Sequence, residues 1–341
     1  MTERRNMKEW IGNVIAEKKR IAIPIMTHPG IEMTGRSIRE AVQSGECHAD
    51  AILKLHTAFP SAATTVIMDL TVEAEAFGCQ IDFPENDMPH IKGRLVSTEE
   101  EILNLRVPEL SQGRIPEYLK ANELSARQIT DKPVLAGAIG PFSLAGRLFD
   151  MSEIMVACYM EPDAIGILLD KCTELIINYC KELKKVGCNG VVLAEPAAGL
   201  LSNEDCSMFS STYIRRLVEA VQDDTFIVVL HNCGNKGQCT DAMLETGAAA
   251  YHFGNAAHMK SILEVCPADV LVMGNVDPVG VLKMKTPAEI KQITLDLLEE
   301  TAAFPNFVLS TGCDLPPHVP EANISAFYEA LNEFNNLYVG R

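Results

Sequence analysis

The chain has 341 residues, of which 47% are hydrophobic and 22% are charged, a composition typical of a well-packed globular protein and not of a disordered one. Its formal net charge of −17 at pH 7 argues against nucleic-acid binding, because a polyanionic partner requires clustered Lys and Arg. The N-terminus lacks the apolar core of a signal peptide, and no run approaches the roughly 18 apolar residues of a membrane span. We therefore expect a cytoplasmic protein with no membrane partner, whose eleven cysteines are mainly reduced thiols.

The first elements are expected to be a helix, a strand and a broken helix. Apolar residues in 7–19 recur at helical spacing and predict an N-terminal helical extension that covers the fold. Residues 20–26 read as a first strand, and residues 37–58 read as a helix interrupted at Gly45.

Seven further apolar, β-branched runs each end in polar, Gly or Pro residues. They are residues 64–68, 133–137, 190–194, 226–230, 248–253, 270–273 and 307–310. Segments with helical periodicity separate most of them, at residues 163–185, 210–221, 236–245, 259–265 and 287–301. Eight strands alternating with helices predict an α/β protein, a single (β/α)8 TIM barrel formed by residues 1–341, with a doubly wound open sheet as the main competitor.

The segment 71–132 is too long for an ordinary connection between the second and third strands. Residues 78–93 resemble a two-stranded excursion, and residues 98–105 and 115–127 resemble short helices. We expect 71–132 to be a cap inserted over the mouth of the barrel.

Polar residues collect at the predicted C-terminal ends of the strands, where a barrel builds its active site. They are His28, Asp69, Glu195, His231, Cys233, His252, Asn275, Asp277 and Cys313. In the stretch Phe226-Ile-Val-Val-Leu-His-Asn-Cys233, strand alternation directs His231 and Cys233 to the same face. Cys313 ends a second such run, so that three N/S ligands with an open fourth position predict a catalytic Zn²⁺. The alternative is two core thiols beside a hydrogen-bonded imidazole.

The other candidates carry weaker signals. Glu195 closes its strand and is expected to be a fourth, exchangeable metal ligand or a catalytic proton-handling group, although a carboxylate bonded to a loop amide explains it equally well. Asp69 is a second catalytic candidate, and Asn275 and Asp277 are candidates for cofactor binding, yet both aspartates could equally cap a loop or a helix. The acidic residues at 73 and 75 read as a solvated or docking face.

Three motifs resemble the uroporphyrinogen decarboxylase superfamily. They are Gly137-Ala-Ile-Gly-Pro-Phe-Ser-Leu-Ala-Gly146, Met273-Gly-Asn-Val-Asp-Pro278 and Thr311-Gly-Cys-Asp-Leu-Pro-Pro-His-Val-Pro-Glu-Ala-Asn323. The likeness runs from about residue 7 to 335 and implies a (β/α)8 barrel. The decarboxylases of the superfamily carry an arginine-rich N-terminal motif that grips substrate carboxylates. The corresponding segment here, 26–35, contains no arginine before Arg36.

The proposed ligands point to another branch of that superfamily. The decarboxylases have a histidine where this chain has Cys313, whereas Asp69 resembles their central aspartate. His231, Cys233 and Cys313 are similar to the zinc site of the corrinoid-dependent methyltransferases, which include the methylcobamide:coenzyme M methyltransferases and the enzymes that demethylate methoxylated aromatics. Residues 6–10 and 68–78 look closest to the second group.

The resemblance implies Zn²⁺ and a corrinoid as cofactors. The Asp-x-His-x-x-Gly motif of corrinoid-binding modules is absent, so a separate corrinoid protein is expected to dock over the rim. The sequence leaves the formation of a homodimer undecided. We expect zinc-dependent methyl transfer, with a methoxylated aromatic favoured over a thiol acceptor. The alternatives are porphyrinogen decarboxylation and a non-catalytic protein that binds a methylated ligand.

Overall fold

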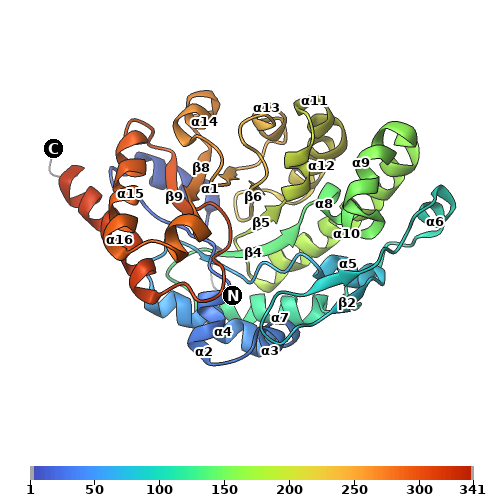
Figure 1. Ribbon diagram of the computed structural model, residues 1–341, viewed down its shortest axis with the longest axis horizontal. Helices are drawn as coiled ribbons and strands as arrows, with labels where there is room; N and C mark the ends of the chain where they lie inside the picture. The colour runs from blue at the N-terminus through green and yellow to red at the C-terminus, as the bar shows by residue number, and fades with distance from the viewer. Residues whose placement is uncertain (1–3, 339–341) are drawn as a thin grey trace.

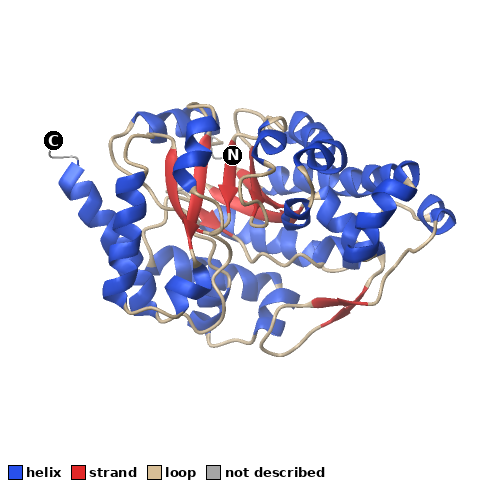
Figure 2. Ribbon diagram, turned by 45° about the horizontal axis from the view of Figure 1, so that its top comes forward, coloured by secondary structure: helices blue, strands red, loops and turns tan. Residues whose placement is uncertain are grey.

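A curled sheet of seven parallel strands forms the centre of the molecule, and helices surround it (Figures 1 and 2). The computed structural model describes residues 4–338, so the predicted unit of residues 1–341 extends at both ends outside the described residues. The strands lie in the order β1 (Thr64–Thr65), β4 (Val134–Ile139), β5 (Gly190–Ala194), β6 (Ile227–Asn232), β7 (Ala250–Phe253), β8 (Leu271–Val276) and β9 (Phe307–Thr311). The α/β class and the parallel, TIM-barrel-like arrangement are thereby confirmed.

The predicted first strand, residues 20–26, is not a regular strand. It lies between β9 and β1, because the Ile23 amide donates to Leu309 O at 2.9 Å and the Ala62 amide donates to Ala22 O at 2.9 Å. Pro24 has no N–H to donate on the side of β1. On the side of β9, the Ile25 amide donates to Thr311 Oγ1 at 3.0 Å and not to a backbone carbonyl, so only a single bridge, Ala22 to Leu309, forms.

The predicted second strand, 64–68, shortens to two residues for a related reason. The amide of Ile67 donates to His48 Nε2 at 3.0 Å, and the amide of Met68 donates to Thr27 Oγ1 at 3.2 Å. Side chains therefore take backbone donors that a longer strand would have used in its ladders.

The inside of the curled sheet is filled by alternate residues of the strands. One apolar cluster gathers Ile23, Ile25, Ala63, Leu135, Val192, Ile227, Val229, Ala250, Leu271, Met273 and Val308 with Met7 and Ile11. The last two belong to α1 (Met7–Ala16), whose first amide donates to Asp224 O at 2.6 Å. The predicted N-terminal helix thus covers the end of the sheet at which the strands begin.

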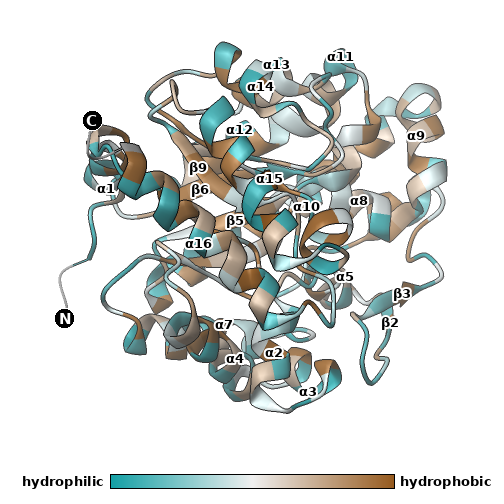
Figure 3. Cartoon of the chain, turned by 60° about the vertical axis from the view of Figure 1, so that its left-hand side comes forward, coloured by the Kyte–Doolittle hydropathy of each residue, from teal (hydrophilic) through white to brown (hydrophobic). Residues whose placement is uncertain are grey.

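Amphipathic helices cover the outside of the sheet, with apolar residues turned inward and polar residues outward (Figure 3). They are α4 (Gly45–Ala58), α7 (Ile115–Gln128), α10 (Pro162–Val186), α12 (Thr212–Val221), α13 (Thr240–Leu244), α14 (Met259–Val265), α15 (Pro287–Glu300) and α16 (Glu321–Tyr338). The helix expected at 236–245 begins only at Thr240, since the Asn235 side chain accepts from the amides of Gly237 and Cys239 and forms a turn. Elsewhere Thr286 and Glu289 form a capping box that starts α15.

The long insertion contains the predicted elements. They are the antiparallel strands β2 (Gln80–Asp82) and β3 (His90–Lys92), and α6 (Glu99–Asn104). The insertion begins with a further short helix, α5 (Val72–Phe77), which was not predicted. Figure 2 shows the hairpin set apart from the central sheet. Helix α7 instead packs against α4, α10 and β4 and serves as the crossover to β4. The role of the remaining segment, 71–114, as a cap over the mouth stays a prediction.

Short helices after the strands were not predicted, because most of them are too brief to show a period. They are α2 (His28–Thr34), α8 (Pro141–Phe149), α9 (Met151–Met160), η1 (Pro196–Leu200), α11 (Asn203–Cys206), η2 (Ser207–Ser211) and η3 (Pro278–Lys283). The helix predicted over 37–58 with an interruption at Gly45 is confirmed as α3 (Ile38–Gln43) and α4. Within residues 4–338, no helix combines the length and apolarity needed to cross a membrane.

Candidate metal centre

His231, Cys233 and Cys313 converge at the C-terminal ends of β6 and β9. Their ligand atoms all lie within 4.8 Å of one another, and Cys313 Sγ is 3.9 Å from His231 Nε2. His231 continues the inward-facing series of Ile227 and Val229, so that it lies directly above the apolar interior. Residues far apart in the sequence therefore form one group of an imidazole and two thiols.

The donor set and its spacing fit a zinc ion. Zn–S bonds of about 2.3 Å and Zn–N bonds of about 2.0 Å at tetrahedral angles put ligand atoms roughly 3.5–3.8 Å apart, close to the separation observed between Cys313 and His231. The imidazole is buried, whereas Cys233 and Cys313 are half-buried. The Cys313 thiol lowers the pKa of Cys233 to about 7, while the same interaction raises the pKa of Cys313.

A chain of buried polar groups extends from His231 across the interior. His231 Nδ1 is 2.7 Å from His252 Nδ1, and His252 Nε2 is 2.8 Å from Ser310 Oγ. The Ser310 hydroxyl lies 2.7 Å from the carbonyl oxygen of Ile23. Burial lowers the pKa of His252 well below its usual value and keeps the ring neutral. His252 was predicted from the sequence as a candidate residue but was given no role, and Ser310 was not predicted. The signal that could have identified Ser310 is a hydroxyl on the inward face of an apolar strand.

Two glycines allow the loops that carry the ligands to approach closely. A Cβ on Gly254 would lie 2.4 Å from the carbonyl oxygen of Cys233, and a Cβ on Gly312 would lie 2.5 Å from the amide nitrogen of Asn255. The loops after β6, β7 and β9 are therefore in backbone contact beside the group.

Glu195 lies beside this group without joining it. Its amide donates to His231 O at 2.8 Å, but alternation along β5 turns its side chain toward α8, where Oε1 accepts from the Ser143 amide at 2.8 Å. Gly140 makes room for the carboxyl group, because a Cβ there would lie 1.4 Å from Oε2. Oε2 has no hydrogen-bond partner among the described residues, and burial raises the pKa of Glu195 to about 8. The acid is therefore neutral and turned away from the three ligands.

Asp69 is fully engaged by other side chains. Its Oδ1 accepts from the amide and hydroxyl of Thr71 at 2.9 and 2.7 Å, and its Oδ2 accepts from Arg114 Nη1 and from Tyr118 Oη. Arg114 also binds Glu75, at 2.6 Å. The network ties the insertion to α7, and a catalytic role for Asp69 stays a prediction that would require these bonds to open.

Asn275 and Asp277 hold the loops after β7 and β8 together. Asn275 Nδ2 donates to the carbonyl oxygens of Gly254 and Ala257 at 2.8 and 2.7 Å. Asp277 caps η3 and accepts from Asn255 Nδ2 at 3.1 Å. Their assignment to cofactor binding stays a prediction.

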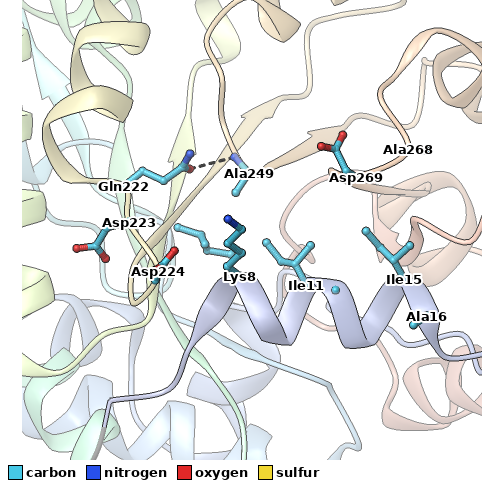
Figure 4. Close-up of a pocket in the computed structure, with 12 residues that line it drawn as sticks. Lys8, Ile11, Ile15, Ala16, Gln222, Asp223, Asp224, Ala249, Ala268 and Asp269 are labelled. Carbon is cyan, nitrogen blue, oxygen red and sulfur yellow. Dashed lines mark hydrogen bonds between the residues drawn. The ribbon is translucent and has the colours of Figure 1, made fainter.

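A cavity of about 710 Å³ lies at the opposite end of the fold, between α1 and the segments that precede β6, β7 and β8 (Figure 4). Ile11 and Ile15 form part of its wall, and Asp223, Asp224 and Asp269 lie around it. It holds none of the candidate residues, so its size does not make it the catalytic site.

Both the sequence and the fold of this chain are similar to those of known proteins. A family model described as uroporphyrinogen decarboxylase (URO-D) matches residues 19–334. A methylcobamide:CoM methyltransferase of Methanosarcina mazei is 29% identical over 299 residues, which cover 85% of this chain and 86% of the relative. A uroporphyrinogen decarboxylase of Christiangramia forsetii is 24% identical over 283 residues, with 80% of each chain covered. A solved methyltransferase structure from M. mazei has a TM-score of 0.87 at 24% identity, covering 97% of this chain and 99% of the other, and shows the same fold.

Proposed function

The chain belongs to the uroporphyrinogen decarboxylase family, and on that premise we propose that it is a zinc-dependent methyltransferase that moves a methyl group between a small substrate and the cobalt of a corrinoid held by a separate protein. The observation that carries this proposal is the imidazole and two thiols of His231, Cys233 and Cys313, gathered within 4.8 Å at the C-terminal ends of the strands. The relatives named methylcobamide:CoM methyltransferase support the corrinoid.

Two features of the sequence disfavour porphyrinogen decarboxylation. Porphyrinogen carboxylates require bidentate cationic donors, and the segment 26–35 contains no arginine; the next one along the chain is Arg36. Cys313, where the decarboxylases carry a histidine, contributes a soft ligand instead.

Within the proposed reaction, this chain holds the metal and keeps one side of it accessible. His231, Cys233 and Cys313 would bind the ion, and the half-buried thiols leave room for a substrate atom as the fourth ligand. Bound zinc would supply Lewis acidity to that atom. A second, larger face of the site must admit the corrinoid of the partner, which points to docking at the rim formed by the loops that follow the strands.

Two substrate classes fit this arrangement. The named relatives favour a thiol that exchanges a methyl group with the corrinoid. A methoxylated aromatic, which the sequence favoured, would leave as a phenolate. Glu195 holds a proton because its pKa is raised, but it can deliver that proton only after its side chain leaves the Ser143 amide and turns toward the three ligands. In that case the corrinoid would accept the methyl group released when the methyl–oxygen bond breaks, and the phenolate would take the proton of Glu195.

The proposal is tested by metal analysis and methyl transfer in ligand variants. Wild type should contain roughly one zinc per chain, and Cys233→Ser, Cys313→Ser and His231→Ala should lose zinc and methyl transfer together. Cys266→Ser is the matched control, because Cys266 is also half-buried but is not part of the group. A variant at one of the three ligand positions that retains full activity without bound metal would contradict the proposal.

The substrate class is decided by a panel assay. Incubation of the zinc-loaded protein with Co(I) cobalamin and methoxyarenes, methylamines or methyl thioethers should give methylcobalamin, detected by its absorption spectrum. Glu195→Gln should slow demethylation of methoxyarenes by roughly 10²- to 10⁴-fold if Glu195 is the general acid, and should leave transfer to or from a thiol nearly unchanged.

A further inference from the structure

We propose that Ser310 and His252 fix the proton of His231 on Nδ1. In the metal-free protein, Nε2 of His231 is therefore already unprotonated and ready to bind the metal. The proposal rests on the zinc site of the proposed function and names two positioning residues for it. Neither side chain belongs to the group of ligand atoms, and both are almost completely buried, so they act through hydrogen bonds.

The argument begins at the far end of the chain of polar groups. The carbonyl oxygen of Ile23 can only accept a hydrogen bond, and it lies 2.7 Å from Ser310 Oγ. The single hydroxyl proton of Ser310 must therefore point at Ile23. His252 Nε2, 2.8 Å from the same hydroxyl oxygen, must then be the donor of the next bond.

The direction of the bond from His252 to Ser310 also determines the direction of the bond between His252 and His231. A neutral imidazole carries one N–H, so a proton on Nε2 of His252 leaves its Nδ1 as an acceptor. His231 Nδ1 is 2.7 Å from that acceptor and must donate to it. Nε2 of His231 is consequently unprotonated, and it is this atom that lies 3.9 Å from Cys313 Sγ.

The backbone supports the same direction. His231 and His252 are paired neighbours on β6 and β7, and Ser310 lies on the inward face of β9, next to the segment containing Ile23. Strands β6, β7 and β9 hold His231, His252 and Ser310, and the bond from the Ile23 amide to Leu309 O holds Ile23 beside β9, so the tautomer of His231 is set by the sheet and not by the metal. Such outer partners of a metal-bound histidine orient its ring and raise its basicity.

The first test reads the tautomer directly. Long-range ¹H–¹⁵N spectra of the metal-free, ¹⁵N-histidine-labelled full-length protein should show His231 with its proton on Nδ1 and His252 with its proton on Nε2. Finding the His231 proton on Nε2 in the wild-type protein would overturn the proposal. Absence of zinc binding would instead count against the proposed function, and the spectra would still decide the tautomer.

The second test uses a matched pair at His252. His252→Asn places an amide oxygen near the former Nδ1 and keeps an acceptor for His231, whereas His252→Phe keeps a ring and removes the acceptor. Zinc affinity, measured by competition with a chromophoric chelator, should fall roughly 10- to 100-fold in the Phe variant and stay near wild type in the Asn variant. Equal affinities in the two variants, whether both weakened or both unchanged, would contradict the proposal.

Ser310→Ala provides an independent variant in case the His252 variants fail to fold. It removes the oxygen that accepts from His252, so the two rings should populate both tautomers and zinc affinity should fall. Ser125→Ala is its control, because Ser125 is equally buried and its hydroxyl has no partner among the described residues. Unchanged His231 spectra and unchanged zinc affinity in Ser310→Ala would overturn the proposed direction of the bonds.

Discussion

The carboxyl group of Glu73 is buried between α5 and the end of β4, so Glu73 is not part of a solvated face. Only 1% of Glu73 is exposed, its Oε1 accepts from the Ile139 amide at 3.1 Å, and Oε2 has no partner among the described residues. Burial raises the pKa of Glu73 from 4.5 to about 7. Glu75 is half-buried and binds Arg114.

This shift makes stability depend on pH. Because the folded state holds the proton more tightly than the unfolded state, the free energy of unfolding should fall as pH rises from about 4.5 to 7 and level off above. Glu73→Gln should remove this loss, which amounts to roughly 3 kcal/mol. Urea unfolding of both proteins between pH 4.5 and 8 measures the difference, and parallel curves would refute the assignment.

At the scale of elements, Arg114, at the start of α7, connects that helix to α5 and to the loop that follows β1. It bonds Asp69, Glu75 and Thr71, and its side chain is almost completely buried. Arg114→Leu would leave the Asp69 carboxylate buried without its main counter-charge, which typically costs about 3–5 kcal/mol. We expect this loss in global unfolding and faster proteolysis between residues 78 and 93.

The control for Arg114 is an exposed ion pair. Arg94 binds Glu153 at the surface, so Arg94→Ala should change stability by no more than about 1 kcal/mol. If the two substitutions had equal effects, the network around Asp69 would not anchor the insertion.

Gly254 determines how closely the loops after β6 and β7 approach. Gly254→Ala should displace the Cys233 carbonyl, 2.4 Å from the new Cβ, and should weaken zinc binding by at least roughly tenfold. Gly166→Ala in α10 is the control, because its Cβ would meet only Tyr213 Oη at an ordinary 3.5 Å. Chelator competition compares the two, and equal zinc affinities would show that the approach is not required.

At the scale of the whole molecule, residues 20–26 form the least regular part of the ring. The amide of Ile23 bonds β9, yet Pro24 interrupts the ladder and β1 has only two residues. Hydrogen exchange should therefore show at least roughly tenfold lower protection for the amides of Ile23 and Leu309 than for those of β5 and β6. Uniform protection around the sheet would contradict this weak point.

The sequence predicted those parts of the fold that depend on local pattern. Strands and outer helices follow from periodicity, and the metal group follows from alternation along β6 together with the cysteine after β9. The bonds of Asp69, the outward direction of Glu195 and the contact at Gly254 depend on which loops meet, which no local pattern encodes. Short helices such as α2 and η3 were not predicted for the same reason, because tertiary contacts stabilise them.

Ser310 belongs both to the hydrogen bond that joins β9 to Ile23 and to the chain that orients His231. The first of these contacts joins residues separated by 287 positions, and Cys313 follows His231 by 82. During synthesis on the ribosome, the nascent chain therefore cannot assemble the site until the segment from Ser310 to Cys313 has emerged. Capture of zinc by His231 and Cys233 alone would be weak, so tight metal uptake should begin only after β9 and Cys313 have joined the sheet.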